Sequence, residues 1–330
     1  MLLKTPESAE NSPLKLENVP LPGPGNQEIL LQVLTCGVCH TDLHILEGDL
    51  VPPKYPVIPG HQVVGRVVMA GEGVAEGMIG QRVGAYWLHS ACGACEYCLR
   101  GFENLCPSAQ FTGFHVPGGF ADYLLADARF VVPIPQSITD EQAAPLLCAG
   151  VIGYRSLKKC ELEPGEQLGL FGFGASAHLV LQVARYWNCE VFVFTRSRAH
   201  QQHALEMGAA WARGADQIPD KLLDRAILFA PAGDLVPLAL KAVRPGGTVA
   251  INAVHLSPIP EMPYELIYGE RTLRSVANVT RKDASEFFML AQEIGVQATV
   301  KIYDLAEANR ALVDLKYSRF NGEAVLRVAK

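Results

Sequence analysis

The chain has 330 residues, of which 49% are hydrophobic and 19% are charged, and its formal net charge is -6. The length suggests two domains of ordinary size, and the apolar fraction is too high for a disordered chain. Nothing in the charge balance indicates nucleic acid or an anionic membrane as a partner.

The N-terminal residues contain no apolar run of signal-peptide length, and no stretch approaches the roughly 18–20 apolar residues of a membrane span. We therefore expect a cytoplasmic protein. In a reducing compartment its nine cysteines are expected to be ligands, catalysts or small buried residues rather than disulfides.

The first half of the chain predicts short strands separated by turns. Pro and Gly at 21–25 exclude helix there, and Pro56 and Pro59 do the same before the apolar run that ends at Val68. Residues 140–154 favour helix on either side of Pro145. The expected strands lie at 28–35, within 55–68, at 80–84 and within 116–125.

Residues 36–44, C-G-V-C-H-T-D-L-H, gather two thiols, two imidazoles, a hydroxyl and a carboxylate. Such donors suit a soft divalent metal, and the hydroxyl beside an imidazole suits proton transfer. A solvated polar loop with incidental cysteines is the alternative. His61, between a turn and a strand, is either a ligand or a hydrogen-bonded core residue. Cys148 alone indicates a small buried side chain.

The strongest local signal is the spacing C-x₂-C-x₂-C-x₇-C. Two-residue gaps let neighbouring thiolates turn onto one ion, and a fourth thiolate closes the tetrahedron without leaving a position for water. The pattern therefore predicts a structural zinc site, with an iron–sulfur cluster as the alternative. Its members are Cys92, Cys95, Cys98 and Cys106.

The second half predicts a dinucleotide-binding unit. An apolar strand at 167–171 leads into G-F-G-A-S-A, a helix at 177–187 follows, and a second strand covers 190–195. In this context Gly172 allows a tight turn, Gly174 lets a pyrophosphate approach, and Ala177 permits close packing of helix on strand. The phosphates would lie at the N-terminus of the helix.

Later segments continue the alternation and predict a doubly wound parallel sheet. Beyond Ala284 the pattern is helix, strand, helix, strand, which we expect to rejoin the first domain. Further strands are expected at 226–230, 248–252 and 272–277, with a helix at 235–243.

The end of the second strand, Thr195 followed by Arg196 and Arg198, has no carboxylate to bind the adenosine ribose. A neutral residue and two arginines suit a 2′-phosphate, so NADP(H) is expected to be favoured, with NAD(H) possible. The alternative is that both arginines face solvent.

Taken together, these motifs resemble the zinc-containing medium-chain alcohol dehydrogenases over nearly the whole chain. G-V-C-H-T-D-L-H, G-H-x-V-V-G, the four-cysteine lobe, A-P-L-L-C-A-G and the glycine-rich turn occur in the order of that family. The resemblance implies an α/β fold, a doubly wound Rossmann sheet plus a mostly β, GroES-like catalytic domain. The catalytic zinc domain would comprise 1–149 and 285–330, and the dinucleotide-binding domain 150–284.

The resemblance also implies roles for single residues. Cys39, His61 and Cys148 match the catalytic zinc ligands, and the four-cysteine lobe matches the structural zinc, which makes two Zn per chain. Asp42 matches the carboxylate that orients the ligand histidine. The proton relay matches Thr41 and His44, the pyrophosphate contact matches His40, and the substrate pocket matches Leu46, Leu50 and Trp87, joined by Phe111 or Phe114.

The implied activity is hydride transfer between a primary (or secondary) alcohol and NAD(P), which interconverts alcohol and aldehyde or ketone. An apolar pocket predicts aliphatic or aromatic alcohols rather than polyols. Competing hypotheses are a non-catalytic zinc and nucleotide sensor, a polyol dehydrogenase, a zinc-free quinone reductase and a thiol–disulfide role for Cys36 and Cys39. The loop at 107–118 is short, as in the microbial tetramers of the family, and this resemblance implies a homo-oligomer, a tetramer or dimer, built through the edge strand at 272–277.

Two positions depart from the family pattern. Gln62 follows His61 where the family commonly has Glu, which removes a negative charge near the metal. Glu323 stands where an arginine often meets the pyrophosphate, although Arg319 is close in sequence.

Overall fold

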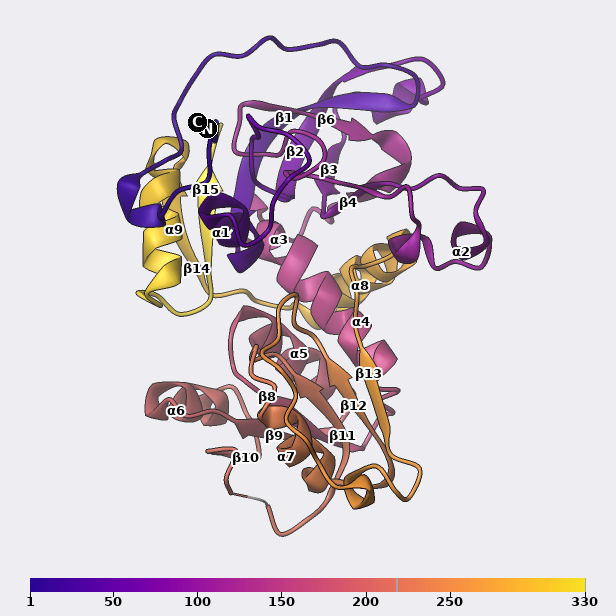
Figure 1. Cartoon of the computed structure of the whole chain (residues 1–330). Coiled ribbons are helices and arrows are strands. Elements are labelled where there is room, and N and C mark those ends of the chain that lie inside the picture. Colours follow the sequence, from indigo (N-terminus) through magenta and orange to yellow (C-terminus); the bar gives the residue numbers. More distant parts are fainter. Residues whose placement is uncertain (218, 330) are drawn as a thin grey trace. The chain divides into compact units, whose positions relative to one another are not determined.

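The computed structural model describes residues 1–217 and 219–329, and the chain divides into two compact units (Figure 1). Unit 1 comprises Met1–Cys148, Asn278–Glu293 and Gln297–Lys330, and unit 2 comprises Ala149–Ala277 and Ile294–Val296. The expected domain bounds, 1–149 with 285–330 and 150–284, remain predictions. Arg281 is bound to Glu103 of unit 1 through its guanidinium and its backbone N–H.

Unit 1 is built on a mostly antiparallel sheet with strand order β14-β15-β1-β2-β3-β7, and β6 also pairs with β1. Its central strand β1 extends three residues beyond the expected end, to Val38, because it forms antiparallel ladders with β2, β6 and β15. The strands are β1 (Glu28–Val38), β2 (Gln62–Ala70), β3 (Arg82–Ala85), β6 (Tyr123–Asp127), β7 (Val131–Pro133), β14 (Val300–Asp304) and β15 (Glu323–Arg327), with a separate pair β4 (Leu88–Ser90) and β5 (Gln110–Phe111).

The helices of unit 1 are short, apart from the one that follows Asn278. They are α1 (His40–Glu47), α2 (Glu96–Leu99), α3 (Asp140–Pro145), α8 (Arg281–Ile294) and α9 (Ala308–Lys316), with 3₁₀ turns at Ala9–Asn11, Glu76–Met78, Glu103–Leu105, Ala128–Phe130 and Leu305–Glu307. The apolar core lies between the sheet, α1 and α9, and includes Leu31, Val63 and Leu312.

The helix expected around Pro145 is interrupted. Helix α3 ends at Pro145, a π-helical turn covers Leu146–Gly150, and α4 (Val151–Lys159) follows in unit 2. Proline lacks the backbone donor that a regular helix requires, and π turns are frequent at functional sites. This turn carries Cys148.

Unit 2 has the predicted doubly wound parallel sheet, with strand order β10-β9-β8-β11-β12-β13. The order reverses between β8 and β11, where a crevice for a ligand is expected in this fold. The strands are β8 (Gln167–Phe171), β9 (Glu190–Phe194), β10 (Trp211–Arg213), β11 (Leu223–Leu228), β12 (Val243–Ile251) and β13 (Thr272–Ser275). The helices are α4, α5 (Ala175–Tyr186), α6 (Arg198–Glu206) and α7 (Leu235–Ala242), with a 3₁₀ turn at Tyr264–Leu266.

Within the described ranges, no helix combines the length and apolarity that crossing a membrane requires.

Candidate metal centres and active site

The first site begins at the N-terminus of α1, where Cys39 is the N-cap. Its Sγ accepts a hydrogen bond from Thr41 N (3.3 Å), and its own N–H donates to Asp42 Oδ2 (3.0 Å). This reciprocal arrangement is a capping box. The sequence C-H-T-D thus fixes both the Cys39 sulfur and the Asp42 carboxylate at the start of the helix.

Three donors from distant parts of the chain meet beside this cap. The ligand atoms of Cys39, His61 and Cys148 all lie within 4.8 Å of one another, and His61 Nε2 lies 3.3 Å from Cys39 Sγ. We refer to these three residues as the triad. Asp42 Oδ1 lies 3.3 Å from His61 Nδ1 and accepts a hydrogen bond from Gly60 N (3.0 Å). A carboxylate on one ring nitrogen leaves the other free to bind a metal.

Without a metal ion, the pKa values of the two thiols in this cluster are shifted in opposite directions. A hydrogen bond from Cys148 holds the pKa of Cys39 well below its usual range, and the same bond raises the pKa of Cys148. Burial raises the pKa of Asp42, although His61 opposes this effect. A divalent cation bound between the two sulfurs would displace the protons that they carry.

The donor set fits a catalytic zinc. Two thiolates and an imidazole leave a fourth position open on a tetrahedral ion, and the residues Cys39 and Cys148 are partly buried whereas His61 is buried. This Cys₂His set with an open position is the one known from catalytic zinc in alcohol dehydrogenases.

Cys36, the other cysteine of C-G-V-C, is not among the three donors that lie within 4.8 Å of one another. It is fully buried in the core, and burial raises its pKa well above the usual range. A thiol–disulfide role requires an accessible thiolate, so this environment argues against that alternative.

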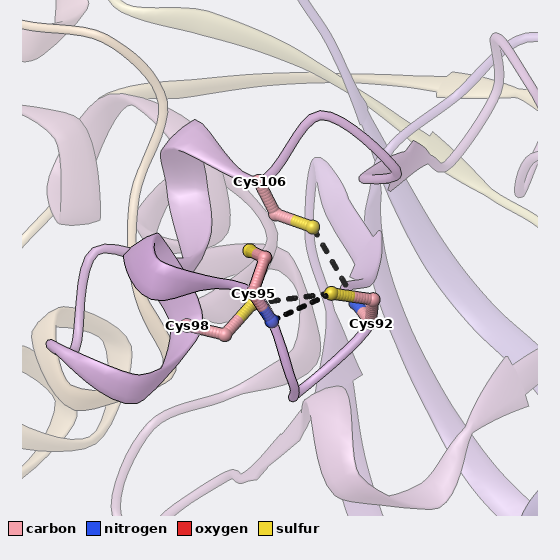
Figure 2. Close-up of side chains that lie close together, drawn as sticks. All are labelled: Cys92, Cys95, Cys98 and Cys106. Atoms are coloured by element: carbon pink, nitrogen blue, oxygen red, sulfur yellow. Dashed lines mark hydrogen bonds between the residues drawn. The ribbon is translucent and has the colours of Figure 1, made fainter.

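The four-cysteine lobe forms a second cluster (Figure 2). Cys92 N donates to Cys106 Sγ (3.5 Å), Cys95 N donates to Cys92 Sγ (3.3 Å), and the sulfurs of Cys92 and Cys98 are 3.9 Å apart. Backbone N–H groups near Ala94 and Cys95 lower the pKa of Cys92 to about 6, whereas desolvation raises that of Cys98 to about 12. All four sulfurs lie within 4.8 Å of one another, which fits a closed tetrahedral site.

The lobe is fastened to α8 by a contact that sequence reasoning missed. The carboxylate of Glu103 accepts hydrogen bonds from Arg281 N (2.7 Å) and Arg281 Nη2 (2.7 Å), and the guanidinium lies 4.6 Å from the centre of the Phe130 ring. No local pattern signals this pair, because its partners are 178 positions apart.

The predicted relay residues lie on α1. Thr41 and His44 are three positions apart and therefore share one helix face. His44 Nδ1 lies 3.0 Å from Asp49 Oδ2, and its side chain is partly exposed. His40, the first residue of α1, is exposed. The relay and the pyrophosphate contact remain predictions.

The residues expected in the substrate pocket have different surroundings. Trp87 contacts the edge of His61 (5.1 Å between ring centres) and stacks on Phe111 (5.1 Å), with Phe114 tilted beside it (5.8 Å). An aromatic wall thus adjoins the triad. Leu46 is fully buried in the core of unit 1, and Leu50 packs against that core. Their roles toward substrate remain predictions.

In unit 2 the glycine-rich turn lies between β8 and α5. Gly172 has φ 95°, and a Cβ atom there would lie 2.8 Å from Ala230 N, so both conformation and space require glycine. Gly174 is the N-cap of α5, and a Cβ atom there would meet nothing within 4 Å. Ala177, in the first turn of α5, is fully buried. The turn therefore leaves the backbone N–H groups at the start of α5 uncovered by side chains, as anion binding at a helix N-terminus requires.

The end of β9 leads directly into α6. Thr195 is buried and its carbonyl accepts a hydrogen bond from Gln201 Nε2 (2.7 Å), whereas Arg196 and Arg198 are exposed. Ser197 caps α6 by accepting from His200 N (3.3 Å). Two exposed guanidinium groups therefore flank a helix N-terminus, where an anion is favoured.

A histidine pair between α5 and α6 also escaped sequence reasoning. The rings of His178 and His203 are 4.9 Å apart, and Phe173 lies 4.3 Å from His178. Burial, with repulsion from His203 and His200, lowers the pKa of His178 to about 4. His178 is therefore neutral at pH 7 and packs as part of the helix contact.

Comparison with known proteins agrees with this architecture. The family model described as "Alcohol dehydrogenase GroES-like domain" matches residues 25–136. A probable alcohol dehydrogenase, AdhA, from Mycobacterium tuberculosis is 45% identical over 99% of this chain and 96% of its own length.

Two solved structures share the fold. A cinnamyl alcohol dehydrogenase from Sorghum bicolor is 29% identical, with a TM-score of 0.89 over 99% of this chain and 97% of that one. A Helicobacter pylori enzyme called CAD, solved with NADP(H), is 25% identical, with a TM-score of 0.83 over 92% of this chain and 91% of that one.

A GroES-like unit that carries the triad, together with a parallel dinucleotide-binding unit, defines a nicotinamide-dependent oxidoreductase. The chain belongs to the medium-chain zinc alcohol dehydrogenase family.

Proposed function

We propose that the chain is a zinc-dependent alcohol dehydrogenase that interconverts a primary (or secondary) alcohol and its aldehyde or ketone, with NADP(H) as the favoured cofactor. The observation that carries the proposal is the triad of Cys39, His61 and Cys148 within 4.8 Å, with Asp42 behind the histidine ring. A sensor that binds zinc without catalysis would need neither the open fourth position nor Thr41 and His44 beside it.

Bound by the triad, zinc would act as a Lewis acid on a substrate oxygen, and the nicotinamide would exchange the hydride. The protein supplies the geometry and the proton path. Asp42 keeps Nε2 of His61 turned toward the sulfurs. Thr41 Oγ1 would accept the hydroxyl proton of the substrate, and His44 would pass it to solvent. Asp49 Oδ2, 3.0 Å from Nδ1 of His44, holds the orientation of the imidazole ring.

The activity is tested by zinc content per chain and a panel of alcohols with both cofactors. Two zinc ions per chain and oxidation of primary alcohols are expected. Thr41→Val, which keeps the shape and removes the hydroxyl, is expected to lower kcat about 100-fold or more, the usual scale for lost proton transfer. Zinc-loaded protein that oxidises none of the panel would contradict the proposal.

The cofactor preference is supported by the two arginines after Thr195 and the lack of a carboxylate at the end of β9. The NADP(H) complex of the Helicobacter pylori enzyme concerns that protein, so the proposal for this chain rests on its own residues. Arg196→Ala is expected to raise KM for NADPH about ten-fold and to leave KM for NADH nearly unchanged. Arg310→Ala, which removes an exposed arginine of unit 1, is the control.

The substrate class is supported by the aromatic wall of Trp87, Phe111 and Phe114 beside His61. Such a wall offers apolar contact and few partners for hydroxyl groups, so hexanol or a benzylic alcohol is expected to outperform sorbitol. Equal kcat/KM values for hexanol and sorbitol would contradict this expectation.

We also propose a cytoplasmic homo-oligomer, a tetramer or dimer, formed through β13. This strand is an edge of its sheet, and Tyr264 and Tyr268 are exposed before it. An edge strand with apolar neighbours favours pairing with a second copy. Light scattering of the purified protein tests the assembly, and a monomer at micromolar concentration would contradict it.

A further inference from the structure

Two buried polar side chains of unit 1 take no part in either cysteine cluster. Gln62 is 0% exposed and Glu323 is 4% exposed. Both polar atoms of Gln62 and Oε2 of Glu323 have no hydrogen-bond partner among the described residues. An unpartnered carboxyl or carboxamide in a protein interior costs free energy of folding, so these two require an explanation.

The sheet register brings the two side chains to one face of β1. Gln62 pairs with Gly37 across β1 and β2, while Gly37 pairs with Val325 across β1 and β15. Residues that face each other in an antiparallel ladder share a face, as do residues two apart along a strand. Gln62 and Glu323 therefore project from the same face, on either side of β1.

Gly37 provides the space between them. A Cβ atom at position 37 would lie 2.5 Å from Gln62 Oε1, so the carboxamide lies where another residue would place its side chain. From there Gln62 acts on the Glu323 carboxyl and lowers its pKa, although the two groups do not reach hydrogen-bond geometry.

The register also places Glu323 beside the triad. The antiparallel pairing of β1 with β15 ends at Val38 and Ala324. One residue further along each strand, Glu323 is opposite Cys39. Among described residues, no lysine or arginine forms an ion pair with Glu323. Burial raises its pKa well above the usual range, and Cys39 and Asp42 raise it further, while Gln62 and His61 lower it. A cation bound by the triad would supply the positive charge that this carboxyl lacks.

We propose that Glu323 is an uncoordinated carboxylate of the catalytic metal site, which strengthens cation binding by charge, and that Gln62 holds it in place across Gly37. Glu323 is not among the donors within 4.8 Å of one another, which is why its contribution is charge and not coordination. The inference rests on the proposed metal site and gives a role to Glu323, which the sequence analysis named only as a departure from the family's arginine.

The test measures the Co²⁺ affinity of the triad by competition with a chelator. Binding is monitored by the thiolate-to-cobalt absorption band, and the Cys39→Ser variant gives the signal that comes from the four-cysteine lobe alone. Glu323→Gln keeps the shape and removes the charge. It is expected to weaken binding about 10- to 100-fold, the scale for groups that support metal ligands. The double variant Gln62→Glu/Glu323→Gln returns one carboxylate to the same face and is expected to recover part of the loss. Glu307→Gln removes a partly exposed acid of the same unit and is the control for Co²⁺ affinity.

Thermal unfolding of the metal-free protein separates this role from a structural one. Glu323→Gln removes an unpartnered buried acid, so Tm without metal is expected to equal or exceed that of the parent. A lower Tm without metal, combined with unchanged Co²⁺ affinity, overturns the inference. If the parent and Cys39→Ser bind Co²⁺ identically, the proposed metal site itself fails, which is a different result.

Discussion

The two cysteine clusters of unit 1 obtain their donors in opposite ways. The triad takes one donor from the start of α1, one from the residue before β2 and one from the π-helical turn after α3. The lobe takes all four sulfurs from 92–106. A buried carboxylate supports the triad, whereas backbone N–H groups support the lobe. The triad therefore depends on the packing of the whole unit, and the lobe depends on one local loop.

The largest expected effect follows from removing a triad donor. Cys148→Ser is expected to lower kcat/KM about 100-fold or more and to reduce zinc from two to one per chain, because three ligands are the minimum for catalytic zinc. Kinetics and metal analysis of the same preparation check this outcome. Cys36→Ser, a nearby buried cysteine outside the triad, is the matched control and is expected to keep its activity.

Next in size is the loss of a lobe donor. Cys95→Ser is expected to remove the other zinc and to lower Tm, because a structural zinc contributes directly to folding. The fraction that stays folded is expected to retain kcat within a few-fold. Thermal unfolding and active-site titration measure the two effects. A larger loss of kcat than of folded protein would show that the two clusters are not independent.

The two clusters are also expected to differ in how their zinc affinity depends on pH. Protons compete for four sulfurs in the lobe but for two sulfurs and one imidazole in the triad, so affinity of the lobe falls more steeply with acid. In the metal-free lobe, backbone N–H groups lower the pKa of Cys92 to about 6, so protons compete strongly for this thiolate only below that pH. Between about pH 7 and about pH 5, zinc release from the lobe is expected to span a narrower pH range than zinc release from the triad. Zinc release is measured with a zinc indicator as the pH is lowered. The Cys39→Ser protein reports the lobe alone, and its difference from the parent reports the triad.

The smallest effect is expected at the contact between the lobe and α8. Arg281→Met leaves the buried carboxylate of Glu103 without its ion pair. A loss of about 2 kcal/mol of unfolding free energy is expected, below the cost for a fully buried pair, because the arginine is partly exposed. Urea unfolding with zinc bound measures it. Lys282→Met, at the next position with an exposed i,i+4 pair, is expected to change stability by less than about 0.5 kcal/mol.

The amino-acid sequence determined the elements whose signals are local. The four-cysteine spacing, the strand–turn–helix around Gly172 and the polar run of 36–44 each follow from short-range geometry of ligands, turns and caps. The alternation of apolar strands and helices gave the parallel sheet of unit 2 for the same reason.

Tertiary structure decided which distant groups meet. The local sequence around Cys148 indicates only a small buried side chain. In the folded unit, the π-helical turn after Pro145 brings its sulfur to Cys39 and His61. The pairing of Glu103 with Arg281 and the approach of Glu323 to the triad depend on strand register and helix docking. Such contacts join positions far apart in the chain, where no local preference of the backbone can signal them.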